Sequence, residues 1–382
     1  MFYSKFLINE IEMTNMSILY DTFEEKIEYS SSMKMEENMN KEEISVSIIC
    51  ATYNHEKYLK YALNSILNQK TTFKFEVLVG EDCSTDDSRK ILKYYEEKYP
   101  NFFTIFYRKK NFGPIKNFID LYYRAKGKYL VVLETDDFWI DELKLQKSFD
   151  FLESNNDYIA VSHRCIIVDE NNNSIGKQYP ECHKSEYSYD EYMKDLLPGQ
   201  TTTVMFRNFF LKELNYSIEL LTEDKYCIGP GDARKAFTFI VNGKVACLPD
   251  VMSAYRLVTS GGSSYSANVK RNPCEIIKRR KAVVEYSRNC LDNSKALYVS
   301  EYLLIRDIFM GIIKRNGVYT ISQLLSEIKK TENKLKILLN VIKYLLYSII
   351  RKIRKKNKTY LPSNINNENK ILKCKKSIYD IY

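Results

Sequence analysis

The 382-residue chain has no uninterrupted apolar run of 18 residues, which is about the length that a helix needs to cross a bilayer. Its first residues are not followed by the apolar core of a secretory signal, so we expect a cytoplasmic protein. The nine cysteines form no Cys-x-x-Cys pair, which fits free thiols in a reducing compartment. Only three histidines are present, which disfavours a histidine-rich zinc site.

The chain also lacks the short motifs of several enzyme classes. No Gly-x-Gly-x-x-Gly follows the first predicted strand and no Gly-x-x-x-x-Gly-Lys-Ser/Thr is present, which disfavours dinucleotide dehydrogenases and P-loop enzymes. Neither Gly-x-Ser-x-Gly nor His-Glu-x-x-His occurs, which argues against the common serine hydrolases and the zincins. The composition, 45% hydrophobic and 28% charged, is that of a globular protein.

Short apolar runs and segments of helical periodicity alternate from residue 44 onward. The predicted strands span residues 44–50, 75–79, 103–107, 129–134 and 158–168. The predicted helices between them span residues 56–69, 86–99, 114–126 and 141–154, and Ser84 or Thr85 is expected to cap the second. Further along we expect short strands at 202–206, 245–248 and 252–256, and helices at 232–242 and through most of 268–350. This alternation predicts an α/β fold with a mostly parallel sheet.

Composition divides the chain into three predicted regions: a polar, acidic extension (1–43), an α/β domain (44–265) and a helical, basic C-terminal region (266–382). In the last region, residues 337–350 are apolar but interrupted by Asn340 and Lys343, and a basic run follows to residue 358. We expect 337–358 to lie on an anionic membrane surface as an interfacial helix. The alternative is a helix packed on the domain with a solvated basic end. Nucleic acid is not an expected partner, because aromatic platforms do not alternate with these basic residues.

Three carboxylates, Glu134, Asp136 and Asp137, directly follow the apolar run 129–133. Carboxylates held this closely repel one another, and a divalent cation with a diphosphate ligand removes that cost. Hard oxygen ligands suit Mg²⁺ or Mn²⁺. The alternative is a solvated acidic turn before the next helix.

Polar residues also follow the first two predicted strands. Thr52 and Tyr53 come after the first strand, and Asp82 after the second. Neighbouring parallel strands place such loops at one edge of a sheet, where ligands of α/β proteins bind. Tyr53 is expected to stack on a nucleotide base and Asp82 to accept a hydrogen bond from it. The alternatives are a surface aromatic and a turn or helix-capping aspartate.

Three ordered segments, 46–54 (VSIICATYN), 81–86 (EDCSTD) and 134–139 (ETDDFW), closely resemble bacterial family 2 glycosyltransferases. The resemblance covers about residues 44–260. It implies a GT-A fold and a nucleotide-sugar donor, with a UDP-sugar favoured over a GDP-sugar. The chain departs from the common pattern at Glu81 and Glu134, where Asp is frequent, and at Thr135, where Gly or Ser is frequent.

The resemblance also assigns roles to single residues. The candidate donor-binding residues are Thr52, Tyr53, Asp82, Asp136 and Arg256. Asp137 is the first candidate metal ligand, followed by Asp136 and Glu134. Arg256 pairs with phosphate or forms a structural salt bridge. Residues 199–207 are expected on the acceptor side, and loop 260–264 is expected to close over the donor.

The segment Gly-Pro-Gly-Asp at 229–232 precedes a predicted helix, and related proteins place the catalytic base in an equivalent acidic motif. Asp232 is therefore the candidate base, with helix N-capping as its alternative role. The implied reaction is inverting, metal-dependent sugar transfer to a glycan or lipid-linked acceptor. The alternatives are a sugar-nucleotide nucleotidyltransferase, whose glycine-rich loop is missing from 51–55, and a non-catalytic membrane-surface protein on the same scaffold.

Overall fold

The computed structural model describes residues 43–179, 184–211, 216–227, 231–258, 273–314 and 319–356. The chain divides into two compact units, Met1–Glu43 and Ile44–Tyr382, and the elements below belong to the second. The expectations for the N-terminal extension and for loop 260–264 fall outside the described residues, as do Gly229 and Pro230.

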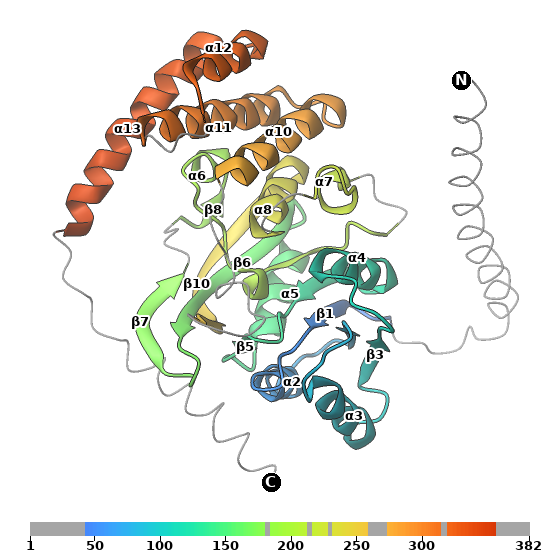
Figure 1. Cartoon of the computed structure of the whole chain (residues 1–382). Helices are drawn as coiled ribbons and strands as arrows, with labels where there is room; N and C mark the ends of the chain where they lie inside the picture. The colour runs from blue at the N-terminus through green and yellow to red at the C-terminus, as the bar shows by residue number, and fades with distance from the viewer. Residues whose placement is uncertain are drawn as a thin grey trace, which may run out of the picture. The chain divides into compact units, whose positions relative to one another are not determined.

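Four parallel strands form the first half of the sheet, in the order β3-β2-β1-β4 (Figure 1). They are β1 (Val46–Thr52), β2 (Phe75–Glu81), β3 (Phe103–Tyr107) and β4 (Tyr129–Val132). The helices that connect or follow them are α2 (Leu59–Leu67), α3 (Ser88–Lys98), α4 (Pro114–Arg124) and α5 (Lys144–Ser154). This part agrees with the alternating pattern of the sequence.

Side chains of β1 alternate between two core layers because successive residues of a strand point to opposite faces. Val46, Ile48 and Cys50 belong to the layer that contains the buried face of α2. Ile49 belongs to the other layer, with Leu121 of α4. Both faces of β1 are therefore covered, which explains its almost continuous apolar sequence.

The second half of the sheet is mixed. Its strands are β5 (Phe138–Trp139), β6 (Tyr158–Val168), β7 (Ser174–Tyr179), β8 (Glu186–Tyr187), β9 (Met205–Arg207) and β10 (Lys244–Arg256). β9 pairs antiparallel with both β4 and β6, and β6 pairs parallel with β10. Short helices α6 (Tyr189–Tyr192) and α7 (Glu219–Thr222) and the longer α8 (Gly231–Asn242) accompany these strands.

Several predicted elements differ from the structure in detail. β10 is one strand with irregular register against β6, where the sequence predicted two short strands. The strand predicted at 202–206 is a 3₁₀ turn (Thr201–Thr203) followed by β9. Helix α3 begins at Ser88, whose backbone N–H donates to Asp86 Oδ1 at 3.0 Å. The expected cap residue Ser84 instead accepts a hydrogen bond from the backbone of Asn54.

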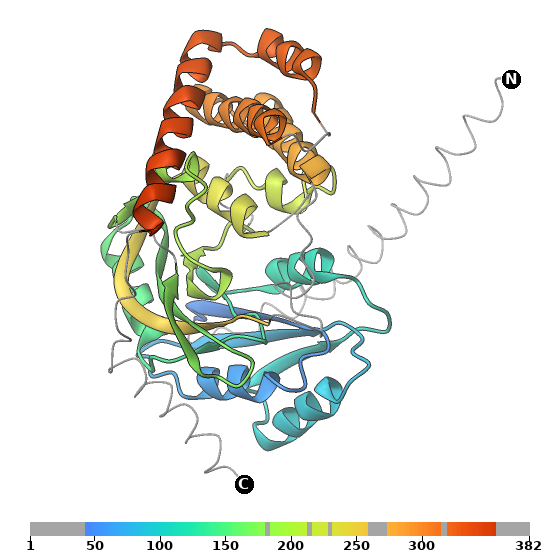
Figure 2. The same cartoon turned by 60° about the vertical axis from the view of Figure 1, so that its left-hand side comes forward.

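Four helices follow the sheet: α10 (Pro273–Asn289), α11 (Ser294–Ile313), α12 (Ile321–Lys330) and α13 (Lys334–Lys356). Figure 2 shows them gathered on one end of the α/β body. None of the described helices is long and apolar enough to cross a membrane.

An ionic network with two buried arginines and the half-exposed Asp195 joins α10 and α11 to the α/β body. Arg280 donates to Asp307 at 2.7 Å and to Asp195 at 2.9 Å. Arg306 contacts both carboxylates and donates to the carbonyl of Met193 at 2.9 Å. Asp195 and Met193 lie just after α6 in the α/β body, so this network attaches α10 and α11 to that body. The pKa of Asp307 is lowered because Arg280 and Arg306 outweigh its burial.

We expect Asp307→Ala to lower the free energy of unfolding by about 3 kcal/mol, because it leaves two buried guanidinium groups with one shared carboxylate. Chemical denaturation measures the change. Glu285→Ala on the exposed face of α10 is the control, with an expected change within about 0.5 kcal/mol. Equal stability of the two variants would contradict a structural role for the network.

Candidate active site

The three strand-end loops predicted from the sequence meet at one edge of the sheet. Thr52 at the end of β1 lies opposite Glu81 at the end of β2, and the N–H of Asp82 donates to the carbonyl of Thr52 at 2.9 Å. On the other side of β1, the N–H of Leu133 donates to the carbonyl of Ile49 at 3.0 Å. The acidic segment 134–137 therefore begins beside the loop that follows β1.

The first two loops hold each other by reciprocal hydrogen bonds that the sequence analysis did not foresee. The N–H of Asn54 donates to Ser84 Oγ at 3.0 Å, and Asn54 Oδ1 accepts from the N–H of Thr85 at 2.8 Å. Asn54 has a positive φ of 54°, a conformation in which asparagine is enriched among non-glycine residues. These contacts fix the backbone that carries Tyr53.

Thr135 joins the acidic segment to the loop after β1. Its hydroxyl is buried, donates to the carbonyl of Ala51 at 3.1 Å, and lies 3.0 Å from Thr52 Oγ1 and 2.8 Å from His55 Nδ1. Thr135, one of the three positions at which the chain departs from the family pattern, thus forms several hydrogen bonds within the site. His55 is a further site residue that sequence reasoning missed.

Two carboxylates of the acidic segment, Glu134 and Asp137, lie in an environment that disfavours their charge. Burial raises the pKa of Asp137 well above its usual range, and the charges of Asp136 and Glu134 raise it further. The pKa of Glu134 is raised to about 8 by burial and then by Asp232 and Asp136. Glu134 Oε2 also accepts a hydrogen bond from Gln200 at 3.1 Å. The structure therefore brings the predicted base close to the predicted metal ligands.

One oxygen of Asp137 is available to a cation. Asp137 Oδ1 accepts from the backbone N–H of Arg256 at 2.8 Å, whereas the buried Oδ2 has no partner among the described residues. An orphaned buried carboxylate oxygen fits a hard divalent ion. The described residues contain no group of three or more His, Cys, Asp or Glu that could hold a metal by themselves. A metal here fits only with most of its ligands from diphosphate and water, as Mg²⁺ commonly binds.

Arg256 is a buried clamp on the acidic segment. Its Nε donates to the carbonyl of Asp136 at 2.7 Å, and Nη1 binds Asn172 in the β6–β7 turn. The guanidinium lies 4.3 Å from the ring centroid of Tyr58. These contacts give Arg256 a structural role through a carbonyl, an amide oxygen and an aromatic ring, whereas the expected structural alternative was a salt bridge. Pairing with phosphate remains a prediction, and Nη2, which is buried and has no hydrogen-bond partner in the described part of the chain, is the atom left for it.

The predicted base-binding residues differ in exposure. Tyr53 is 36% exposed, whereas Thr52 is buried and its hydroxyl faces Thr135. Asp82 is also buried, and its two oxygens accept the backbone N–H groups of Phe112 and Gly113 at 2.6 and 2.9 Å. A carboxylate has about four acceptor positions, and these two N–H groups occupy two of them. Asp82 can therefore accept a further hydrogen bond.

Asp232 lies in the first turn of α8, where Thr201 Oγ1 donates to its Oδ1. Lys235, one turn further, is 3.5 Å from the same hydroxyl. Together with Gln200 these residues line a pocket whose apolar wall includes Phe239. The sequence placed residues 199–207 on the acceptor side, and the contact between Thr201 and Asp232 joins that segment to the candidate base.

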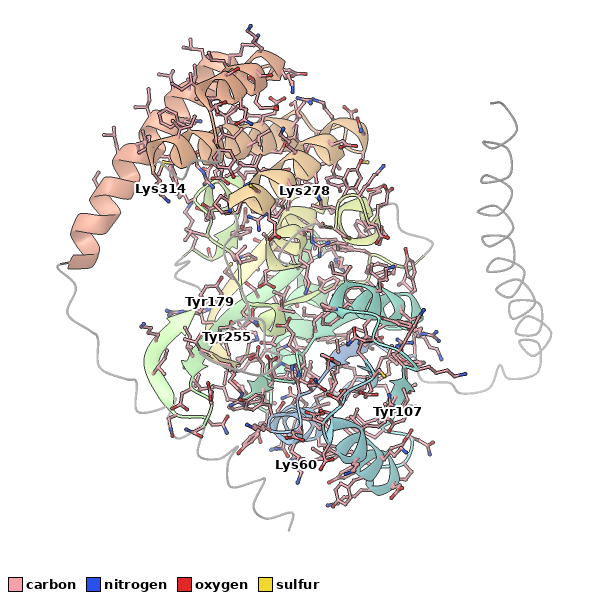
Figure 3. The ribbon with its side chains drawn as sticks, in the orientation of Figure 1. Lys60, Tyr107, Tyr179, Tyr255, Lys278 and Lys314 are labelled. Carbon is pink, nitrogen blue, oxygen red and sulfur yellow. The ribbon has the colours of Figure 1, made fainter. Side chains whose placement is uncertain are left out.

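Tyr179 approaches the same region from β7, a second residue that the sequence analysis missed. Burial raises the pKa of its hydroxyl, and the charge of Asp232 adds to that rise. Figure 3 shows Tyr179 and Tyr255 in the central part of the body, above the α2 residue Lys60. The strands β7 and β10 pair with opposite sides of β6. No periodic signal in the sequence could have placed Tyr179 near Asp232.

Residues 47–216 match the family model described as Glycosyl transferase family 2. This region belongs to that family. The resemblance seen in the three motifs is thereby confirmed.

The curated relatives that the chain resembles include proteins named as glycosyltransferases. An uncharacterized protein of Mycobacterium tuberculosis is 29% identical over 212 residues, 55% of this chain and 58% of that protein. The matched region thus spans little more than half the length of this relative. An uncharacterized glycosyltransferase of Methanocaldococcus jannaschii is 29% identical over 182 residues, 47% of this chain and 62% of that protein. TuaG of Bacillus subtilis, named for teichuronic acid biosynthesis, is 34% identical over 107 residues, 28% of this chain and 41% of that protein.

Among solved structures, S. aureus TarS (residues 1–349) in complex with UDP-GlcNAc superposes with a TM-score of 0.52 at 17% identity, covering 79% of this chain and 81% of that one. The same TarS fragment with UDP gives 0.51 at 18% identity, covering 78% and 81%. At this identity the likeness concerns the fold. The predicted GT-A fold with additional C-terminal helices is confirmed.

A substitution separates the two roles of Arg256 in this glycosyltransferase domain. We expect Arg256→Lys to lower the free energy of unfolding by about 3 kcal/mol, because an ammonium cannot span Asp136 and Asn172 together. Thermal and chemical denaturation without ligands measure the loss. Arg124→Lys, at a half-exposed pair with Asp120, is the matched control and should change stability by less than about 0.5 kcal/mol. Unchanged stability with weakened donor binding would instead assign Arg256 to phosphate.

Proposed function

We propose that the protein transfers a sugar from a nucleotide-diphosphate donor to a hydroxyl of a glycan or lipid-linked acceptor, with inversion at the anomeric carbon. The observation that carries this proposal is the convergence of the family motifs on one site. The acidic segment, with an unpartnered oxygen on Asp137, lies beside the candidate base Asp232. Donor-side loops lie along the same edge of the sheet.

The donor nucleotide is assigned to the loops after β1 and β2. The exposed ring of Tyr53 supplies a stacking face, and Asp82 keeps an acceptor position for a base N–H. A UDP-sugar is favoured over a GDP-sugar. The similar TarS structures, which hold UDP-GlcNAc and UDP, support this preference through the fold.

Mn²⁺ or Mg²⁺ is assigned to the acidic segment, with Asp137 as the first candidate ligand and Asp136 or Glu134 as the next. Since the described residues contain no group of three such residues placed for a metal, diphosphate and water would supply most of the ligands. The ion, when bound, supplies positive charge that stabilises the departing nucleoside diphosphate. Thr135 and Arg256 hold the backbone of the segment in place. These contacts fix the backbone that carries the carboxylates proposed to hold the ion.

Asp232 acts as the general base. Its carboxylate accepts the proton of the acceptor hydroxyl while that oxygen attacks the anomeric carbon and the bond from that carbon to the diphosphate oxygen breaks. Thr201 binds Asp232 Oδ1 and so orients the carboxylate. The products are a glycoside of inverted configuration and a nucleoside diphosphate. The transition state resembles an oxocarbenium ion.

The acceptor is assigned to the pocket that contains Gln200, Thr201 and Lys235. Amide, hydroxyl and ammonium groups suit the hydroxyls of a sugar. TuaG is named as a teichuronic acid biosynthesis glycosyltransferase, which supports a polysaccharide or glycoconjugate acceptor here.

Donor and metal binding can be tested by thermal shift. We expect UDP-sugars to raise the melting temperature more in Mn²⁺ than in chelator, and more than GDP-sugars do, because the metal links the acidic segment to the diphosphate. At a ligand concentration of 100 times Kd, binding contributes about 2.7 kcal/mol of stability. If no nucleotide sugar stabilises the protein and the metal makes no difference, the proposal is wrong.

The base is tested by Asp232→Asn, which keeps size and hydrogen bonding but cannot accept a proton. We expect the turnover rate, measured as nucleoside diphosphate release, to fall about 100-fold or more, while donor binding by thermal shift stays the same. Asp190→Asn, in the first turn of α6, is the matched control and should keep full turnover. Retained turnover in Asp232→Asn would remove Asp232 from the mechanism.

A further inference from the structure

Helix α13 has two apolar faces, of which only one is used by the fold. The inner face carries Ile337 and Val341, which are buried in the core together with residues of α11. Asn340 on the same side donates to the hydroxyl of Tyr298, and the ring of Tyr344 lies 4.7 Å from the guanidinium of Arg306. These contacts dock α13 on α11.

The other face of α13 is an exposed apolar stripe. Six side chains between 39% and 73% exposed follow one another at helical spacing, Leu335, Leu338, Leu339, Ile342, Leu346 and Ile350. Positions three or four apart lie on the same side of a helix, so they form one continuous band, the outer stripe. The two residues that interrupt the apolar sequence, Asn340 and Lys343, fall outside this band. Figures 1 and 2 show α13 along the margin of the body, without another described element over its outer side.

Positive charge flanks the outer stripe. Lys334, Lys336 and Lys343 are exposed and lie beside it, with Lys334 on one edge and the other two on the opposite edge. From residue 334 to residue 358 the sequence contains nine Lys or Arg and no Asp or Glu. α13 thus combines an exposed apolar stripe with flanking positive charge, and it is not apolar enough to span a bilayer. Amphipathic basic helices of this kind bind at the interface of anionic membranes.

We propose that the outer stripe of α13 docks the protein on an anionic lipid surface, with the apolar band in the acyl boundary and the flanking lysines at the headgroups. Charge decides between occupants. A second copy of this chain would bring a second set of the same positive charges against the first, whereas an anionic membrane neutralises them. The inference goes beyond the proposed transfer reaction and does not depend on it.

Vesicle co-sedimentation of the full chain, without donor or acceptor, tests the proposal. We expect binding to phosphatidylcholine vesicles that contain phosphatidylglycerol, weak binding to pure phosphatidylcholine, and loss of binding as salt is raised. Leu339→Glu should weaken binding about tenfold or more, because it removes apolar area from the stripe and places a charge there. Lys343→Ala should weaken it about fivefold.

Two matched controls distinguish the stripe from exposed residues in general. Leu143→Glu replaces a leucine of similar exposure on another surface, and Lys93→Ala removes an exposed lysine of α3; both should bind vesicles as the unmodified chain does. Leu339→Glu should leave the melting temperature unchanged, since Leu339 is half-exposed.

Absence of vesicle binding, equal binding to neutral and anionic vesicles, or full binding by Leu339→Glu would each overturn the proposal. If light scattering instead shows a dimer that Leu339→Glu dissociates, and vesicles are not bound, the outer stripe belongs to a second copy. Nucleoside diphosphate release with soluble acceptors is measured separately, so its loss bears only on the proposed transfer reaction.

Discussion

Mutual repulsion of closely placed carboxylates is the constraint on which the arrangement of the site depends. Burial raises the pKa values of Glu134 and Asp137, and the charge of Asp136 raises both further. Asp232 adds to the rise at Glu134, and Glu134 adds to the rise at Asp137. A chain free to relax would move these groups into water. Here Thr135 binds the segment to the β1 loop, and Arg256 binds it from the opposite side. These contacts keep the cluster together at the edge of the sheet, where the donor is proposed to bind.

Arg256 connects this constraint to the rest of the fold. It stands at the end of β10, the long strand that pairs with β6, and it contacts the β6–β7 turn through Asn172. Its backbone N–H binds Asp137 while its side chain binds the carbonyl of Asp136. The mixed half of the sheet thus supports the acidic segment that follows the parallel half. The β7 strand beyond that turn also brings Tyr179 toward Asp232.

The C-terminal helices obey a different constraint, which is the balance between packed and exposed apolar surface. Arg280, Arg306, Asp195 and Asp307 fix α10 and α11 to the α/β body. α13 then uses only one of its apolar faces for packing on α11. Large exposed apolar surfaces usually mark sites of interaction. The lysines that border this band therefore indicate which kind of surface it would bind.

Local pattern was sufficient for the parallel half of the fold and for the shared position of the loops that follow its strands. The apolar runs of β1, β2, β3 and β4 follow from burial on both faces, and their polar ends predicted that Tyr53, Asp82 and Asp137 share one edge of the sheet.

Tertiary structure alone decided the contacts between distant positions. Thr135 and His55 are 80 residues apart, and Arg256 and Asp137 are 119 apart. No short-range periodicity records such pairs. The first depends on the pairing of β1 with β4, and the second on the strand order β4-β9-β6-β10. In the sequence, Asn340 and Lys343 interrupt the apolar segment 337–350. Only the packing of α13 on α11 showed which face of the helix is exposed, and both residues lie outside the outer stripe on that face.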